Sequence, residues 1–383
     1  MKLKSTLALA LLAVAAVHAS AQTQGVSKNE IVLGSIQDLS GPLASLGKQV
    51  RYGMQLRVDE LNEQSGGIHG RKIRLLIEDS QYDPKKAVLA TQKLVNQDKI
   101  FAMVGHIGTT SNLAAMPIQF AKNVPNLNPI TASKEMYEPF HKLKFAFSAS
   151  YYDQMRVFAP KLAKEKGAKK VCTLYQDDDF GTEVMNGAEA GLKTIGMTLA
   201  EKTTYKTGAT DFSSQVARLK AANCDMVILG TVLRETIGTI GTARRTGYNP
   251  TFLGSSAAYF DLVHKLGGKA MDGLYAAMTV QNPYLDSASQ PLRFWATKYQ
   301  TKFNEEPAVF SVYGYTAIDN FITAATAAGP NLTTDAFIKA LETVTFPADI
   351  FGSPITKFGP KKRQGSDQAR LSQIVDGKWK VLE

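Results

Sequence analysis

The chain has 383 residues, of which 44% are hydrophobic and 20% charged, and its formal net charge is +10. This length allows two domains with separate cores. The positive charge lies in short groups such as Lys361-Lys362-Arg363 rather than in one basic stripe, and no zinc-finger spacing or RNA-recognition motif occurs, so the sequence argues against nucleic-acid binding.

The N-terminus has the features of an export signal. Lys2 and Lys4 precede an apolar run over residues 7–17, and Ala-Ser-Ala at 19–21 has the small-x-small pattern of a cleavage site. The apolar run is too short for a membrane span, and no later stretch approaches the roughly 20 apolar residues that a span needs. We therefore expect residues 1–21 to be a signal peptide and the mature protein to be secreted and soluble.

Strand-like and helix-like segments then alternate, which is typical of βαβ units with mainly parallel sheets. Asp83-Pro84 has the residues of a helix start, with Asp as the cap and Pro at the first helical position. The expected elements of this first part are strands at 31–36, 73–77 and 124–130 and helices at about 45–63 and 84–96.

The segment from Ile100 to Ala121 is the first candidate binding element. A short apolar strand ends at Val104, glycines follow, and a helix is expected to begin at Thr109. The first N–H groups of a helix have no partner within it and carry the positive end of its dipole, so they suit an anion. No Lys or Arg lies in this segment, so a carboxylate would be held by neutral donors. The alternative is that the hydroxyl residues here are ordinary helix caps.

The pattern restarts near Phe145, which predicts a second lobe of similar plan. Its expected elements are strands at 171–175, 198–205 and 226–230 and helices near 151, at 181–195 and at 212–222. Three further helices are expected near 290–304, 311–328 and 334–343, followed by short strands near 355–358 and 371–375.

Cys172 and Cys224 are the only cysteines, and each stands at the start of a predicted strand. Parallel neighbouring strands could bring them together, and an oxidising compartment permits a disulfide. We treat this bond as a hypothesis, and two free thiols on the folded protein are the alternative.

Motifs of enzymes and metal sites are missing from the sequence. No G-x-S-x-G elbow occurs, and the segment from Gly41 to Lys48 has one residue too many for a phosphate-binding loop and continues with Gln49. The histidines have no paired spacing for a metal, and the acids at 177–179 do not match a calcium loop. We expect a protein that is not an enzyme and needs no cofactor or metal.

Several stretches together carry a family resemblance: 39–47 (LSGPLASLG), 62–73 (NEQSGGIHGRKI), 78–84 (EDSQYDP) and 104–109 (VGHIGT), with Phe180-Gly181 and Asp211-Phe212 in addition. With them the sequence resembles the leucine/isoleucine/valine-binding proteins, the type I periplasmic solute-binding components of ABC importers. The resemblance covers essentially the whole mature chain.

This resemblance implies an α/β fold of two doubly wound lobes that are joined by three crossing segments and close on a solute by hinge motion. The crossings would fall near Ser148, Ala277 and Ile355. One lobe would comprise 22–148 plus 278–354, and the other 149–277 plus 355–383. The implied protein is a periplasmic monomer that delivers a small carboxylate-bearing solute to an ABC permease at the inner membrane.

The resemblance also implies the site. The solute carboxylate would be held by the hydroxyl and backbone N–H groups around Thr109, together with the loop from Ile130 to Ser133. The other residues at matching positions are Ile107, Gly108, Thr131, Tyr151, Phe180, Phe310 and Leu46, the last as a cap over the pocket. The aromatic residues could equally belong to the core.

The sequence departs from the amino-acid-binding pattern. Ser256 stands where an acid usually pairs with the solute ammonium, and Val232 stands where a tyrosine wall is usual. In the first-lobe loop, where a threonine often serves the ammonium, Thr131 or Ser133 would have to substitute. An unpaired ammonium in a closed cleft is unfavourable, so the solute could lack an α-amino group. The resemblance implies a small amino acid of the branched-chain type or a related carboxylate as the solute, with Glu235 as a possible counter-charge. The alternative is an aromatic or dicarboxylic organic acid without an α-amino group, and Arg234 could hold a second carboxylate. A ligand-sensing module with the same fold is a further alternative.

Overall fold

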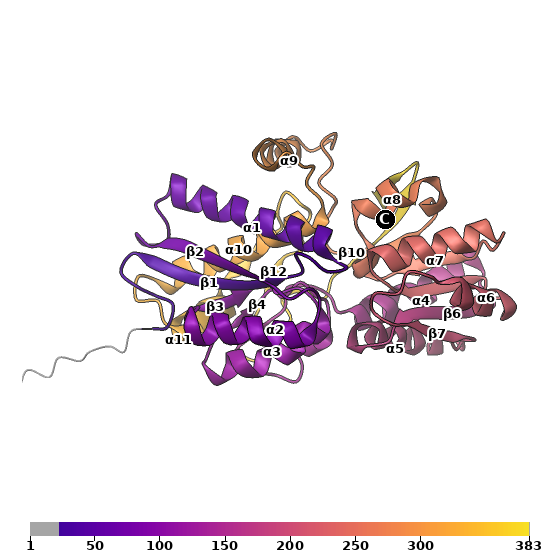
Figure 1. Ribbon diagram of the computed structural model, residues 1–383, viewed down its shortest axis with the longest axis horizontal. Helices are drawn as coiled ribbons and strands as arrows, with labels where there is room; N and C mark the ends of the chain where they lie inside the picture. Colours follow the sequence, from indigo (N-terminus) through magenta and orange to yellow (C-terminus); the bar gives the residue numbers. More distant parts are fainter. Residues whose placement is uncertain (1–22, 383) are drawn as a thin grey trace, which may run out of the picture.

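The computed structural model describes residues 23–382, so the expected signal peptide lies outside the described part of the chain. Two α/β lobes lie side by side along the long axis, and the segments around β10 and β12 run between them (Figure 1). The expected fold class, with two doubly wound lobes, is confirmed. Within residues 23–382, no helix combines the length and the apolar character needed to cross a membrane.

The first lobe is built on a parallel sheet with the strand order β2-β1-β3-β4-β5. The interior strand β1 is almost completely buried, as expected for a parallel strand covered on both faces. Ile31 and Leu33 face one core cluster, and Val32 and Ile36 face another. The strands are β1 Glu30–Gln37, β2 Lys72–Asp79, β3 Ala102–Val104, β4 Asn126–Leu127 and β5 Lys144–Phe145.

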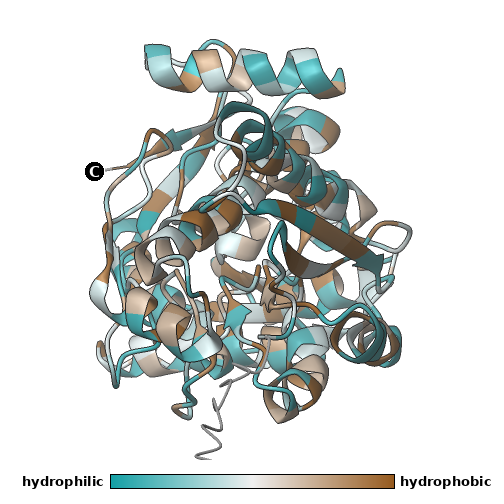
Figure 2. Cartoon of the chain, turned by 90° about the vertical axis from the view of Figure 1, so that its left-hand side faces the viewer, coloured by the Kyte–Doolittle hydropathy of each residue, from teal (hydrophilic) through white to brown (hydrophobic). Residues whose placement is uncertain are grey.

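Helices cover both faces of this sheet (Figure 1). On one face α1 (Ala44–Gln64) packs against α10 (Val309–Ala328), and on the other α2 (Pro84–Gln92) packs against α3 (Thr109–Ala121). A short η1 (Lys93–Gln97) continues α2. The remaining helices of this part are α11 (Thr334–Thr343) and α9 (Gln290–Phe303), and α9 packs on the outer side of α1, where the Tyr52 and Phe303 rings stack with centroids 4.4 Å apart. Hydrophobic residues gather on the inner strands, whereas the outer helices carry many hydrophilic residues (Figure 2).

The second lobe contains a seven-stranded sheet with the order β14-β13-β10-β9-β8-β6-β7. The five strands from β10 to β7 are parallel, and β13 pairs antiparallel with β10 and with β14. Its strands are β6 Val171–Gln176, β7 Lys202–Tyr205, β8 Met226–Gly230, β9 Thr251–Gly254, β10 Tyr275–Met278, β13 Arg370–Val375 and β14 Lys378–Val381. Its helices are α4 Tyr151–Lys166, α5 Asp179–Lys193, α6 Ser213–Ala221, α7 Leu233–Arg245 and α8 Asp261–Gly267.

The third passage between the sheets lies later in the chain than the sequence suggested. β11 (Thr345–Phe346) pairs with β12 (Thr356–Lys357), and the Gly365 N–H donates to the Ala146 carbonyl at 2.7 Å. Residues 356–365 therefore lie beside the first passage, and pairing with the second sheet begins at Arg370. We propose that the third passage lies between Gly365 and Arg370 rather than near Ile355.

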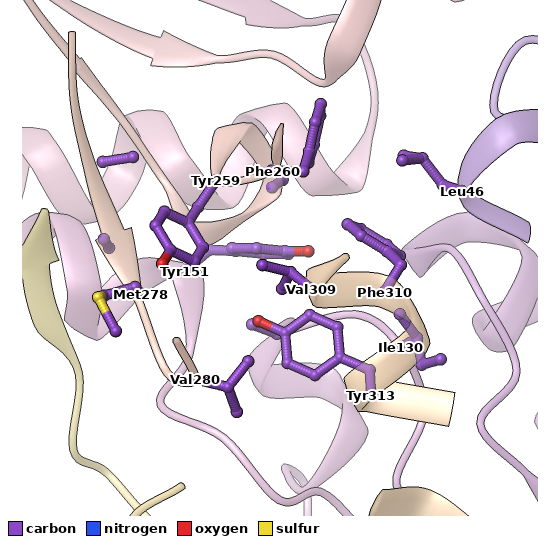
Figure 3. Close-up of a cluster of buried hydrophobic side chains, with 14 of the residues drawn as sticks. Leu46, Ile130, Tyr151, Tyr259, Phe260, Met278, Val280, Val309, Phe310 and Tyr313 are labelled. Atoms are coloured by element: carbon purple, nitrogen blue, oxygen red, sulfur yellow. The ribbon is translucent and has the colours of Figure 1, made fainter. Parts of the chain in front are cut away.

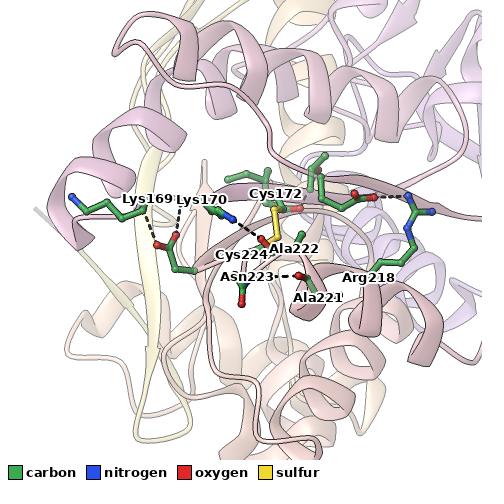
Figure 4. Close-up of a disulfide and its surroundings, with 12 residues drawn as sticks. Lys169, Lys170, Cys172, Arg218, Ala221, Ala222, Asn223 and Cys224 are labelled. Carbon is green, nitrogen blue, oxygen red and sulfur yellow. Dashed lines mark hydrogen bonds and ion pairs between the residues drawn. A yellow bond between two sulfur atoms is a disulfide. The ribbon is translucent and has the colours of Figure 1, made fainter.

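A disulfide joins Cys172 and Cys224, as hypothesised (Figure 4). Cys172 is the second residue of β6, and Cys224 lies just before the neighbouring strand β8, so the sheet brings their Cα atoms to 5.9 Å. Both side chains are buried. The bond therefore ties together the amino ends of two parallel strands of the second lobe.

Candidate ligand-binding cleft

A cavity of about 600 Å³, its mouth included, lies between the two lobes. Its walls come from the segments that follow the carboxyl ends of strands in both sheets, which is where open α/β sheets bind ligands. The expected residues that line it are Leu46, Ile107, Gly108, Thr109, Ile130, Thr131, Tyr151, Phe180, Val232, Ser256 and Phe310.

The start of α3 forms one end of this cleft pocket. The hydroxyls of Thr109 and Thr131 lie 2.6 Å apart and are hydrogen-bonded, and both residues are buried. Within residues 23–382, no side chain caps α3. The first N–H groups of the helix thus stay available to a ligand, next to two hydroxyl groups and at the positive end of the helix dipole.

Gly108 lets the chain turn into this helix. Its φ of 91° lies in the left-handed region, and a Cβ atom here would stand 2.9 Å from the ring of Tyr82. A side chain would therefore be strained and would push against a wall of the cleft pocket.

Aromatic side chains form the other walls. The rings of Tyr151 and Phe180 meet edge to face with centroids 5.0 Å apart, and Phe310 and Tyr313 do so at 5.6 Å. Figure 3 shows Leu46, Ile130, Phe310 and Tyr313 around the same region. Burial raises the pKa of Tyr151 to about 12, so its hydroxyl stays neutral.

None of the described residues that line the cleft pocket has a charged side chain. Ser256, at the position expected for an acid, donates its N–H to Gln154 Oε1 at 2.9 Å, while Gln154 Nε2 donates to its hydroxyl at 3.0 Å. Val232 presents an apolar side chain. The pocket therefore offers hydrogen-bond donors and apolar surface but no counter-charge of either sign.

Two expected site residues do not line the cleft pocket. Arg234 is exposed on the first turn of α7, which agrees with a surface charge. The Ser133 side chain is hydrogen-bonded to Glu135. Glu235, the alternative counter-charge, is buried but also lies outside the lining, and burial raises the pKa of its carboxyl against the lowering effect of Arg234.

Hydrogen bonds connect the lobes next to the cleft pocket. The Thr110 hydroxyl on α3 donates to Asp178 at the start of α5, at 3.4 Å. The Lys134 N–H donates to Glu183 Oε1 of α5 at 2.9 Å, and that oxygen also accepts from the Tyr152 N–H at 3.4 Å. Burial, helped by the nearby Glu135 carboxylate, raises the pKa of Glu183 to about 8. These contacts describe a closed cleft.

Sequence reasoning missed part of the lining. Tyr313 lies one turn after Phe310 on α10, and Thr279 directly follows β10, so helical spacing and the strand end could have indicated both. Phe147 lies on the first passage, where no sequence pattern indicates the direction of a side chain. The lining residues outside the expected set are Leu43, Tyr82, Phe147, Ser148, Ala257, Thr279 and Tyr313, and Ala132 lies within the expected loop from Ile130 to Ser133.

Comparisons with known proteins agree with this architecture. The Leu/Ile/Val-binding protein homolog 7 of Brucella abortus is 25% identical over 312 residues, which cover 78% of this chain and 76% of the relative. The fold is similar to that of a fatty acid ABC transporter substrate-binding protein from Thermomonospora curvata, with a TM-score of 0.85, 23% identity and coverage of 94% of this chain and 93% of the other.

It is also similar to an ABC transporter solute-binding protein from R. palustris solved in complex with benzoate, with a TM-score of 0.81, 20% identity and coverage of 92% of this chain and 96% of the other. The profile of the periplasmic binding protein family matches residues 30–378, almost the whole described chain. The chain therefore belongs to the periplasmic binding protein family.

Proposed function

We propose that this protein is the periplasmic solute-binding component of an ABC importer and that it captures a small monocarboxylic acid without an α-amino group, with an aromatic or branched apolar body. The observation that carries the proposal is the cleft pocket, which joins an uncapped helix start to aromatic walls and has no charged lining residue.

The electrostatics of the cleft pocket favour binding of a simple carboxylic acid over binding of an amino acid. A carboxylate at α3 would accept hydrogen bonds from backbone N–H groups and from the Thr109 hydroxyl, and such bonds to a charged group are among the stronger ones. An α-ammonium group would be buried opposite Ser256 and Val232 without an anion, which is costly in a closed cleft. An acid with an apolar body meets every requirement of the lining.

Transport would proceed by closure and release without any covalent step. The solute would first dock on one lobe, and closure would then bring Phe180 over it and form the contacts of Thr110 with Asp178 and of Lys134 with Glu183. Because the grip depends on neutral donors, opening of the lobes at the permease would let water replace those donors and free the carboxylate.

Two structural neighbours support an acid of this kind, since one is a fatty acid transporter component and the other was solved with benzoate. A branched-chain amino acid is the second candidate, favoured by the curated relatives, which are named as Leu/Ile/Val-binding protein homologs.

Pairs of ligands that differ only in the amino group test the proposal. We expect 4-methylpentanoate and 3-phenylpropanoate to raise the melting temperature more than L-leucine and L-phenylalanine, because a ligand that binds only the folded state stabilises it. Glutarate tests the dicarboxylate alternative. Stabilisation by the amino acids alone would contradict the proposal.

Variants then locate the site. Thr109→Val removes the hydroxyl at nearly constant shape and should weaken the best acid by about 10- to 100-fold, the range for a hydrogen bond to a charged group. Arg234→Ala is the control, because Arg234 lies outside the cleft pocket. Calorimetry should show that this variant binds the acid with unchanged affinity. Equal effects of the two substitutions would remove Thr109 from the site.

A further inference from the structure

A second cavity lies directly behind the cleft pocket. The space among its lining residues, with its opening to solvent counted, is about 450 Å³, and three residues line both cavities: Phe147, Thr279 and Tyr313. We call it the rear chamber. The residues that line it alone include Val280, Thr316, Asn320, Phe346 and Pro354.

The partition between the two cavities is one side chain thick. Phe147 and Tyr313 lie with ring centroids 5.6 Å apart, and the Tyr313 hydroxyl is hydrogen-bonded to the Thr279 hydroxyl at 3.1 Å. In Figure 3 the Tyr313 ring lies between Phe310, which lines the cleft pocket, and Val280, which lines the rear chamber. A rotation of this ring would break one neutral hydrogen bond, which should make the rotated state about fivefold less populated relative to the closed partition.

The rear chamber is suited to an apolar group. Val280, Phe346 and Pro354 supply apolar surface. The one carboxylate in its lining, Asp349, is occupied because it accepts hydrogen bonds from the N–H groups of Phe351 and Ser353 and from the Ser353 hydroxyl. A hydrocarbon chain that enters here would therefore not have to displace a charged group that lacks hydrogen-bond partners.

We propose that the rear chamber is a subsite for the tail of a longer carboxylic acid, whose carboxylate stays at α3 while its distal carbons pass Tyr313. The inference rests on the proposed function, because it takes the carboxylate end of the ligand as fixed. It extends the substrate class from small acids to acids with an alkyl tail of several carbons. Each buried methylene should then improve affinity by roughly fourfold.

Thr316 allows a clean test. It lies one turn after Tyr313 on α10, lines the rear chamber but not the cleft pocket, and its hydroxyl has no hydrogen-bond partner within residues 23–382. Thr316→Phe would fill the rear chamber without removing a hydrogen bond, and Thr316→Val is the matched control of unchanged shape.

Calorimetry with benzoate and 4-butylbenzoate gives the readout. In the unmodified protein we expect 4-butylbenzoate to bind at least tenfold more tightly than benzoate, as several buried methylenes require. Thr316→Phe should weaken 4-butylbenzoate by about tenfold or more while benzoate affinity changes by less than about twofold, and Thr316→Val should change neither. Tyr313→Phe removes only the hydrogen bond to Thr279. It should raise the affinity for 4-butylbenzoate relative to that for benzoate by up to about fivefold.

The outcomes separate the two proposals. If benzoate binds and 4-butylbenzoate does not, or if Thr316→Phe weakens both acids equally, the tail subsite is wrong and the proposed function stands. If neither acid binds any of these proteins while an amino acid does, the proposed function is wrong, and the tail subsite is wrong with it.

Discussion

Replacing Cys172 and Cys224 together with alanine should destabilise the second lobe by about 4 kcal/mol at 25 °C. The disulfide closes a loop with a sequence separation of 52 residues, and the loss of chain entropy in the unfolded state for a loop of that length corresponds to about 4 kcal/mol. Alanine is preferable to serine here because both positions are buried and a serine hydroxyl would have to find a partner.

Tryptophan fluorescence during urea unfolding can report this lobe specifically. The chain has two tryptophans. Trp379 lies on β14 of the second sheet, where its ring packs against that of Tyr259 with centroids 4.9 Å apart. In a Trp295→Phe background, Trp379 is therefore the only reporter. The protein with both cysteines intact, after reduction of its disulfide, is a second form without the bond. It should show the same loss of unfolding free energy.

The position of the disulfide gives the experiment a second readout. The bond joins the amino ends of β6 and β8, whereas the cleft pocket lies at the carboxyl ends of the strands. Affinity for the best acid should therefore remain within about twofold at temperatures where the double variant stays folded. A stability loss below about 1 kcal/mol would refute the loop-entropy reasoning, and a large loss of affinity would refute the separation of the bond from the site.

Three further predictions concern the cleft. Burial raises the pKa of Glu183 to about 8 from an ordinary 4.5, so the folded protein binds this proton more tightly than the unfolded chain and loses stability as the pH rises through that interval. Glu183→Gln should therefore flatten the decline in melting temperature between about pH 5 and pH 8.5. An unchanged decline would mean that other titratable groups cause it. Phe180→Ala should weaken the best acid by about 30-fold and Phe180→Leu by clearly less, as expected for an aromatic wall, and calorimetry that finds both neutral would place Phe180 in the core. Glu235→Gln should leave acid affinity within about threefold because its carboxyl lies outside the lining, whereas a selective loss of leucine binding would support the amino acid candidate.

The sequence predicts the longer strands and helices well where their periodicity is strong. The buried strand at Glu30–Gln37 and the helices that end near Gln64 and Ala328 follow directly from apolar runs, helical spacing and glycine positions. Thr109 could be placed for the same reason, since a glycine turn between a strand and a helix determines where the first N–H groups lie.

The rest of the site depends on tertiary contacts that local patterns do not encode. The family resemblance points to Ser133 and the charge of Arg234 suits a second carboxylate, but one side chain is bonded to Glu135 and the other is exposed to solvent. Phe147 and Thr279 lie on passages between the lobes, where the direction of a side chain is set by how two separate sheets meet. The later position that we propose for the third passage depends on the hydrogen bond from the Gly365 N–H to the Ala146 carbonyl, which joins residues more than 200 positions apart.

The antiparallel pairing of β13 with β10 has a consequence for how the chain matures. Residues 370–375 are synthesised after all five parallel strands of the second sheet, yet they cover one edge of that parallel run. Until they arrive, β10 presents an open edge that other chains can pair with. A copy truncated before residue 370 should therefore aggregate rather than accumulate as a folded half, and completion of this lobe must wait until β13 has been synthesised.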